Sequence, residues 1–231
     1  MKITIAVDGF SSCGKSTMAK DLARELNYVF IDTGAMYRAL TYFALQNGMI
    51  NTNGDIDEAG LCASLKDLSV AFKYDSKSGE ARALLNGEDV EAEIRKPLVS
   101  SHVSNIAAIR QVREFLVAQQ RKMGRAKGVV MDGRDIGTTV FPDAELKIFM
   151  TASEQVRAKR RYDEMLAKGI ELSMEEVKTN IKERDYIDQT RDESPLRQAD
   201  DAEVIDNTNL TPSQQLSVAL EMAKARLAKL S

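Results

Sequence analysis

The sequence has few residues of the kinds that mark secreted, membrane or disulfide-rich proteins. Its 231 residues include two cysteines, Cys13 and Cys62, whose wide spacing fits neither a disulfide framework nor a zinc site and indicates a reducing compartment. The N-terminal apolar run reaches Asp8 too early for a signal peptide, and nowhere do about 18 uninterrupted apolar residues occur. We therefore expect a cytoplasmic protein with no membrane partner.

An excess of basic residues is also missing. Lysine and arginine together number 32 against 35 acidic residues, which gives a formal net charge of −3. The chain thus has no overall positive field to attract duplex nucleic acid, and we expect no nucleic-acid partner. Solenoid-type repeats, low-complexity tracts and proline-rich linkers are lacking as well. The length suits one α/β domain.

Apolar runs of strand type alternate with helical patterns along the chain. Residues 2–7 predict a strand buried on both faces, and four similar runs cover 28–32, 128–133, 146–152 and 202–208. Helical patterns follow these runs, notably at 35–48 and, after the capping box Thr211-Pro212-Ser213-Gln214, through Leu230. Strands separated by helices predict an α/β three-layer sandwich with a five-stranded parallel sheet.

One segment breaks this alternation. Residues 69–95 read as short β-runs joined by a Ser-Gly turn at 78–79 and an Asn-Gly turn at 86–87, with no helix between them. We expect a small antiparallel β insert on the main sheet.

Residues 9–17, GFSSCGKST, follow the first strand and open the first helix. Their pattern, Gly9 and then Gly14-Lys15-Ser16, is that of a phosphate-binding loop. It is specific in this context because successive backbone N–H groups converge on one anion at a helix N-terminus. Lys15 is expected to reach the β- and γ-phosphates, and the Ser16 hydroxyl to bind Mg²⁺. Since such a loop acts through its main chain, we expect Cys13 to be a passive small residue.

Arginines indicate what the bound nucleotide is for. A regulatory GTPase would carry an Asn-Lys-x-Asp motif after a strand, which this chain lacks, and a motor ATPase would normally be larger. Instead, arginines occur in DTGAMYR (32–38), in DGRD (132–135) at the carboxyl end of a strand, and in ERDYIDQTR (183–191). Guanidinium groups pair with phosphate oxygens at two points, and phosphoryl transfer depends on such cations.

Two predicted helices, 153–168 and 173–191, suit a mobile lid. The second begins at the capping box Ser173-Met174-Glu175-Glu176. Along it Arg184, Asp188 and Arg191 follow the spacing i, i+4, i+7 and are expected to share one face. The first helix adds Arg157, Arg160 and Arg161.

Three other polar residues lie beside these motifs. Asp132 ends a strand and either supports the Mg²⁺ water shell or caps the following turn. His102, the only histidine, is expected on a helix surface, and Asp8 is expected to form hydrogen bonds within the loop. Asp188 is a weak candidate for a general base, because a phosphate monoester is already ionised at neutral pH and needs little proton abstraction.

Together these motifs resemble the bacterial cytidylate kinases, a family of nucleoside monophosphate kinases. The similarity covers nearly the whole chain through IAVDGFSSCGKST, DTGAMYRALT, the NGEDV…EIR insert, VSNIAAIRQVRE, DGRDIGTTVFPDA, KERDYIDQTR and VIDNT. It implies a single P-loop kinase domain over 1–231, with a monophosphate-binding region at about 33–110, a β insert at about 69–95 and a lid at about 153–191. It also implies a monomer that transfers the γ-phosphoryl group of ATP to CMP or dCMP with Mg²⁺.

The resemblance further implies the site residues. The ATP loop comprises Gly9, Phe10, Ser11, Ser12, Cys13, Gly14, Lys15, Ser16 and Thr17, with Arg160 as a further ATP contact. Ser104, Arg113 and Asp135 match the residues that hold cytosine. Thr33, Arg38, Arg134 and Arg191 match those around the monophosphate, and Arg184 and Asp188 those near the sugar and the transferred group. The expected catalytic set is Lys15, Arg134, Arg184, Asp188 and Arg191.

Some positions depart from the family pattern, and other functions stay open. Phe10 to Cys13 replace the Pro-Ser-Gly-Ala of many members, Thr33 stands where serine is frequent, and Ile187 where some members have arginine. The nearest alternative is a kinase of another small acceptor, such as UMP, AMP, shikimate or gluconate. A non-catalytic nucleotide switch or an ATP-driven nucleic-acid enzyme is the alternative of a different class.

Overall fold

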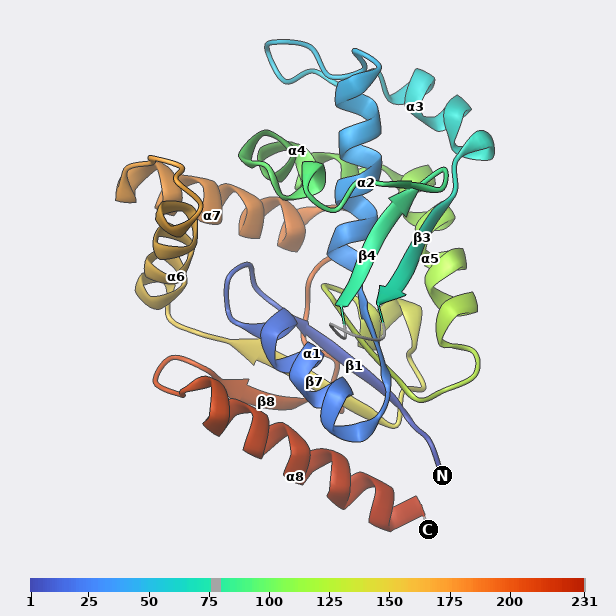
Figure 1. The fold of residues 1–231 in the computed structure, drawn as a ribbon, viewed down its shortest axis with the longest axis vertical. Helices are drawn as coiled ribbons and strands as arrows, with labels where there is room; N and C mark the ends of the chain where they lie inside the picture. Colours follow the sequence, from blue (N-terminus) through green and yellow to red (C-terminus); the bar gives the residue numbers. More distant parts are fainter. Residues whose placement is uncertain (76–79, 231) are drawn as a thin grey trace. The chain divides into compact units, whose positions relative to one another are not determined.

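The computed structural model describes residues 1–75 and 80–230 (Figure 1). It divides into two compact units, residues 1–31 with 124–231 and residues 32–123. The Ser-Gly turn predicted at 78–79 lies outside the described residues. Within those residues, no helix combines the length and the apolar character needed to cross a membrane.

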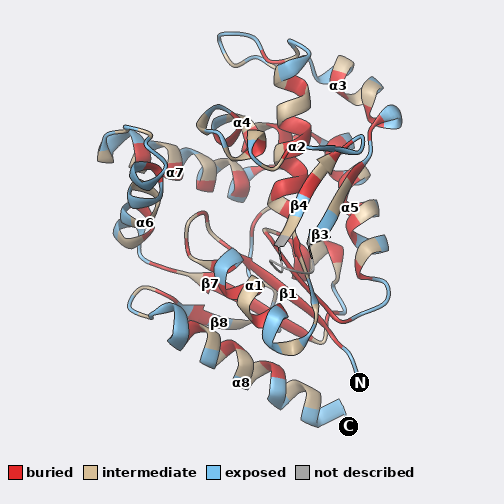
Figure 2. Ribbon diagram, in the orientation of Figure 1, coloured by how far each residue is buried: buried red, intermediate tan, exposed pale blue. Residues whose placement is uncertain are grey.

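The first unit is built on a five-stranded parallel sheet, as predicted. Its strands are β1 (Thr4–Gly9), β2 (Val29–Asp32), β6 (Val129–Gly133), β7 (Leu146–Thr151) and β8 (Glu203–Asp206), in the order β2-β6-β1-β7-β8. The central strand β1 is buried at every residue, as Figure 2 shows. It begins and ends two residues later than predicted, because its pairing with β6 and β7 continues as far as Asp8 and Gly9.

Two helices cover one face of this sheet. Helix α1 (Lys15–Leu26) and helix α8 (Pro212–Leu230) pack side by side (Figure 1). Their apolar side chains form one core with Ile5, Val7 and Ile148 of the strands. Helix α8 starts at the predicted capping box, because the Gln214 N–H donates to the Thr211 hydroxyl at 3.3 Å and the Gln214 amide oxygen accepts from the Thr211 N–H at 2.9 Å.

Helices α6 (Glu154–Ala167) and α7 (Met174–Thr190) pack against each other around Ala158, Val177 and Ile181. The capping box Ser173–Glu176 is present at the start of α7. The prediction that α7 runs to Arg191 is wrong by one residue: Arg191 is the C-cap, and its ψ of 143° turns the chain out of the helix. The Arg191 side chain nevertheless stays beside Asp188, with its Nη1 3.7 Å from the carboxylate.

The second unit contains the helices α2 (Thr33–Gln46), α3 (Glu58–Ser64), α4 (Pro97–Ala108) and α5 (Arg110–Gly124), the last of which ends in the first unit. Its three strands are β3 (Val70–Asp75), β4 (Glu80–Leu85) and β5 (Glu88–Asp89). They confirm the antiparallel insert but form a sheet of their own rather than joining the main sheet. The predicted Asn-Gly turn joins β4 to β5, and Asn86 and Gly87 both have the positive φ, 51° and 85°, that a two-residue hairpin turn requires.

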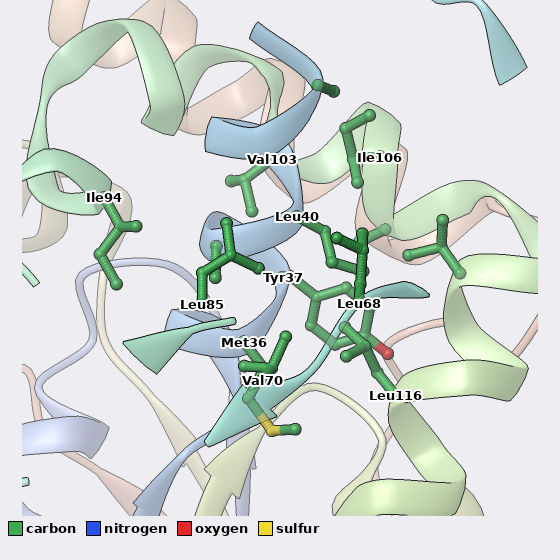
Figure 3. Close-up of a cluster of buried hydrophobic side chains, with 14 of the residues drawn as sticks. Met36, Tyr37, Leu40, Leu68, Val70, Leu85, Ile94, Val103, Ile106 and Leu116 are labelled. Carbon is green, nitrogen blue, oxygen red and sulfur yellow. The ribbon is translucent and has the colours of Figure 1, made fainter. Parts of the chain in front are cut away.

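The core of this unit lies between α2, the small sheet and the helices α4 and α5. Tyr37 and Leu40 of α2 meet Val70 and Leu85 of the sheet and Leu116 of α5, and Figure 3 shows this cluster. Helix α2 begins at Thr33, two residues earlier than predicted, because the Asp32 carboxylate caps it by accepting from the Ala35 N–H at 2.9 Å.

Candidate functional site

The loop between β1 and α1 has the backbone of a phosphate cradle. Gly9 has a φ of 151°, and a side chain there would place its Cβ 2.1 Å from the Met150 carbonyl oxygen. Gly14, with a φ of 97°, is the N-cap of α1. The loop can follow this path only because glycine stands at both positions. Its end coincides with a helix N-terminus of the kind that binds anions.

Lys15 and Ser16, the first residues of α1, point toward the loop and the neighbouring strand. The Lys15 Nζ donates to the Phe10 carbonyl at 3.0 Å. Burial lowers the pKa of Lys15, and the positive charges of Arg134 and Arg184 lower it further. The Ser16 Oγ donates to the Asp132 carboxylate at 2.5 Å. Lys15 therefore lies near two other cations, Arg134 and Arg184. The Ser16 hydroxyl lies beside the Asp132 carboxylate.

The far side of the loop is held by side chains from distant elements. The Cys13 carbonyl accepts from the Asn207 Nδ2 at 2.8 Å and from the Arg160 Nη1 at 3.2 Å. Arg160 also donates to the Asn207 carbonyl at 2.8 Å. Arg160, a predicted ATP contact, thus touches the loop through the loop's main chain. The Cys13 side chain is fully buried in the apolar core, which agrees with a passive role.

Arg134, Asp188, Arg191 and Asp135 form a second buried cluster. The Arg134 Nε donates to the Asp188 carboxylate at 2.8 Å. Arg191 lies 3.7 Å from the other oxygen of Asp188 and 3.8 Å from the Asp135 carboxylate. Asp135, Asp188 and Arg191 are each at most 8% exposed. The charge pattern of 184–191 is therefore not a solvated helix surface.

Asp188 is ionised and holds the arginines together. Although burial by itself raises the pKa of Asp188, the charges of Arg134, Arg184 and Arg191 lower it below its usual range. The same contact raises the pKa of Arg134 against the effect of burial. A carboxylate with a lowered pKa is a poor proton acceptor, so Asp188 is suited to orienting guanidinium groups rather than to general-base chemistry.

Asp8 joins the end of β1 to the turn that follows Asp135. Its two carboxylate oxygens accept from the Ile136 N–H at 2.8 Å and the Gly137 N–H at 2.7 Å. These residues begin a short π-helical turn, Ile136–Val140, which the sequence did not predict. Burial raises the pKa of Asp8 to about 7, although both N–H groups favour the ionised form. The prediction that Asp8 bonds within the loop is wrong in its partners, which lie more than 120 positions away in the sequence.

In the second unit, Asp32 binds two arginines. Its carboxylate accepts from the Arg38 Nη2 at 2.9 Å and from the Arg95 Nη1 at 3.0 Å. Burial by itself raises the pKa of Asp32, but Arg38 and Arg95 together bring it down to about 2. A side chain at Gly34 would put its Cβ only 3.0–3.1 Å from Asp32 and Arg38. The DTGAMYR motif thus fixes Arg38 through Asp32, and it also contains the buried Thr33.

Ser104 and Arg113 lie on the neighbouring helices α4 and α5 of the same unit, and both are buried. The Arg113 Nη1 donates to the Ala107 carbonyl at 3.0 Å. Its guanidinium lies over the Tyr37 ring, 5.4 Å from the ring centre. Arg113 is therefore held in one orientation by a hydrogen bond and a cation–π contact.

The sequence of the chain matches a known protein family. A family model described as "Cytidylate kinase" matches residues 5–225. The chain belongs to the cytidylate kinase family.

Individual cytidylate kinases resemble the chain along almost its whole length. It is similar to the cytidylate kinase of Bacteroides fragilis, with 59% identity over 93% of each chain. The similarity to the cytidylate kinase of Phocaeicola vulgatus is 55% over 98% of each chain, and to that of Porphyromonas gingivalis 52% over 95% of each.

The predicted site residues are divided between the two units. The first unit contains the loop from Gly9 to Thr17 and the cluster around Asp188, whereas the second contains Thr33, Arg38, Ser104 and Arg113. Sequence reasoning missed Asn207 and Asp185, which contact the candidate residues Cys13 and Ser11. It also missed Arg95, which contacts Asp32, the partner of Arg38. Asp32 had a usable signal, because it stands three residues before Ala35 as an N-cap does.

Two further arginines of α6, Arg157 and Arg161, are held by contacts within the first unit. Arg157 is buried and bonded to Asp185 and to two main-chain carbonyls, those of Ser11 and Ala152. Arg161 pairs with Glu164 at 3.0 Å on its own helix. Each guanidinium already has partners in its own neighbourhood.

Proposed function

We propose that this protein transfers the γ-phosphoryl group of ATP to CMP or dCMP, giving ADP and CDP or dCDP. Besides the family, one observation supports the proposal: Arg134 and Arg184 lie close enough to Lys15 of the loop to lower its pKa. Phosphoryl transfer spreads negative charge over the oxygens of the moving group, and clustered cations stabilise that charge. The protein is thus a phosphotransferase whose acceptor is itself a phosphate group.

The donor is assigned to the loop of the first unit. Backbone N–H groups between Gly9 and Thr17 bind the ATP phosphates, with Lys15 at the transferred group. The loop backbone and the α1 N-terminus suit this role. Arg160, which bonds to the loop at Cys13, is a further contact on the ATP side.

Magnesium fits the residues beside the loop. Mg²⁺ prefers oxygen ligands, and when bound with ATP it neutralises charge on the β- and γ-phosphates. The Ser16 hydroxyl and the Asp132 carboxylate are 2.5 Å apart and provide such oxygens. We assign Ser16 as a ligand and Asp132 as a residue that holds the water shell of the ion.

The acceptor phosphate is assigned to Thr33, Arg38, Arg134 and Arg191. Each of the three arginines is oriented by a carboxylate, Arg38 by Asp32 and the other two by Asp188. A guanidinium that is already oriented loses less entropy when it binds a phosphate. Arg184 and Asp188 act near the sugar and the transferred group, where Asp188 orients the arginines.

The cytosine ring is assigned to Ser104, Arg113 and Asp135. Cytosine presents an exocyclic amine donor together with N3 and O2 acceptors, which suit a carboxylate, a hydroxyl and a guanidinium. All three side chains are buried. A base that forms no hydrogen bond with one of them would leave a buried polar group unpaired, which weakens binding. Because UMP has a carbonyl in place of the amine, Asp135 disfavours it.

The organisation of the chain follows from these roles. The region of about 33–110 binds the monophosphate, and the β insert belongs to it. The helix pair at about 153–191 acts as a lid over ATP. The enzyme works as a cytoplasmic monomer on small-molecule substrates, and sedimentation equilibrium at assay concentrations checks the monomer.

An acceptor profile tests the proposal. Purified protein receives ATP and Mg²⁺ with CMP, dCMP, UMP, AMP, shikimate or gluconate in turn, and ADP formation is followed by a coupled assay. CMP and dCMP are expected to give kcat/KM values at least about tenfold above the others, as expected for one well-made polar contact to the base. A better acceptor among the other four rejects the cytosine assignment, and ADP formation that no acceptor accelerates rejects phosphoryl transfer. The Lys15→Ala variant, purified identically, controls for contaminating kinases.

A further inference from the structure

The main chain of Ser11 in the loop forms hydrogen bonds with both helices of the pair α6–α7. The Ser11 carbonyl accepts from the Arg157 Nη1 at 3.2 Å, and the Ser11 N–H donates to the Asp185 carboxylate at 3.4 Å. Arg157 on α6 and Asp185 on α7 also form an ion pair with each other. One charged pair therefore contacts both main-chain groups of a single loop residue.

This pair is buried and has further support. Arg157 and Asp185 are each 8% exposed and Ser11 is 5% exposed. The Arg157 Nε donates to the Ala152 carbonyl at 3.2 Å, just before α6 begins. Charged hydrogen bonds are stronger away from water, and the second carbonyl limits the rotation of the guanidinium. The pair is thus suited to fixing a backbone position.

Phe10 completes the arrangement. Its ring centre lies 5.1 Å from the guanidinium carbon of Arg157 and 5.9 Å from the ring centre of Phe149, which it meets edge to face. Its own carbonyl accepts from the Lys15 Nζ at 3.0 Å. Phe10 therefore contacts Arg157 through its side chain and Lys15 through its main chain, so it has a role beyond supplying backbone to the loop.

We propose that Arg157, Asp185 and Phe10 are positioning residues that hold the phosphate loop in the orientation that binds ATP. The loop binds phosphate through successive backbone N–H groups, so a rotation at Ser11 misdirects the groups that follow it. Asp185 also stands next to Arg184 and one turn before Asp188 on α7. The same contact therefore fixes the loop relative to the helix that carries those residues. The proposal rests on the proposed function only in taking ATP as the loop's ligand.

The main test measures the Kd of ATP with Mg²⁺ by isothermal titration calorimetry, and separately the KM of CMP. Asp185→Asn keeps the shape of the side chain and removes its charge. We expect at least about a tenfold weaker ATP affinity, the loss that accompanies one charged hydrogen bond, with the KM of CMP within about twofold of wild type. Combining Asp185→Asn with Arg157→Lys is expected to weaken ATP binding no further than the more damaging single change, because the two residues act as one unit. Asp163→Asn is the matched control, because Asp163 pairs with Lys159 at 2.8 Å on the exposed face of α6.

A second pair of variants distinguishes the effect of the aromatic face of Phe10 from the effect of its size. Phe10→Tyr keeps the aromatic face and is expected to stay within about twofold of the wild-type Kd for ATP. Phe10→Leu removes that face and is expected to raise the Kd by about threefold or more. If circular dichroism shows that Asp185→Asn does not fold, the ATP affinities of Phe10→Tyr and Phe10→Leu test the proposal instead.

Three outcomes overturn the proposal. The first is an ATP affinity within twofold of wild type in both Asp185→Asn and Phe10→Leu, and the second is an equal rise in the KM of CMP, which marks general structural damage. The third is a wild-type protein that does not bind ATP, which removes the proposed function as well. If the wild type binds ATP but does not phosphorylate CMP, only the proposed acceptor fails, and the ATP affinities still decide the role of the three residues.

Discussion

Replacing Asp8 with asparagine is predicted to remove a pH dependence from the stability of the protein. Burial raises the pKa of this carboxyl from 3.8 to about 7, against the opposing hydrogen bonds from Gly137 and Ile136. Between these two values the folded state binds a proton that the unfolded state does not bind. The contribution of Asp8 to stability is therefore complete below about pH 4 and is lost as the pH rises through about 7.

The size of the effect follows from the two pKa values. A change from 3.8 to about 7 corresponds to on the order of 4 kcal/mol in the free energy of unfolding. About 3 kcal/mol of this falls between about pH 5 and pH 8, where Asp32 and Asp188 stay ionised because their pKa values are lowered.

Urea unfolding at several pH values measures this effect. Asp8→Asn keeps the shape of the side chain and one acceptor oxygen, but it does not titrate. The free energy of unfolding of wild type minus that of the variant is expected to fall by about 3 kcal/mol from about pH 5 to pH 8. Taking this difference cancels the other titrating groups. A difference that stays constant within about 1 kcal/mol, or that rises with pH, refutes the reasoning about burial of Asp8.

Four further changes test other parts of the molecule. Asp32→Ala removes the cap of α2 and the buried partner of two arginines, so urea unfolding should show a loss of about 3–5 kcal/mol, and a loss below about 1 kcal/mol contradicts this. Leu40→Ala opens a cavity in the core of the second unit and should cost about 2–5 kcal/mol in thermal or urea unfolding; no loss would mean that the core is loosely packed. Lys15→Ala should lower kcat by about 10²-fold or more with an unchanged circular dichroism spectrum, and near-wild-type turnover removes it from the catalytic set. Asp135→Ala should relax the preference for CMP over UMP more than it weakens ATP binding, and unchanged discrimination counts against its contact with the base.

Local signals in the sequence were enough for much of the fold. The alternation of buried strand-like runs and helical patterns predicted all five strands of the main sheet, with shifts of about two residues at β1. Capping boxes located the starts of α7 and α8 because a cap depends on residues only three positions apart. The Asn-Gly turn at 86–87 was predictable because few residues accept two consecutive positive φ values.

Features that depend on distant parts of the chain were not predictable. The small sheet β3-β4-β5 is separate from the main sheet, and strand pairing of this kind is set by tertiary packing rather than by turn residues. The π-helical turn at 136–140 depends on Asp8, whose two acceptor oxygens bond its first N–H groups from another strand. The contacts of Arg191 beyond the helix end were unpredictable for the same general reason: its side chain donates twice to the Ser194 carbonyl, at 3.0 and 2.8 Å.

In the candidate site, too, local motifs were predictable and contacts between distant residues were not. Residue types and spacing identified Lys15, Arg38 and Arg134 as candidate phosphate contacts, because few motifs other than phosphate sites combine glycine loops with arginines at strand ends. The carboxylates that orient these cations were harder to assign. The resemblance places Asp188 among the catalytic residues, and its lowered pKa and three arginine neighbours suit it to orienting those arginines. The pairing of Arg157 with Asp185 joins residues 28 positions apart on two helices, which no periodicity reveals.

The central claim, phosphoryl transfer from ATP to a cytidine monophosphate, is tested most directly by following the phosphorus atoms. The purified protein is incubated with ATP, Mg²⁺ and CMP, and ³¹P nuclear magnetic resonance records the products over time. We predict that CDP and ADP appear in equal amounts and that inorganic phosphate does not accumulate. Release of inorganic phosphate with ADP while CMP stays unchanged would contradict the claim.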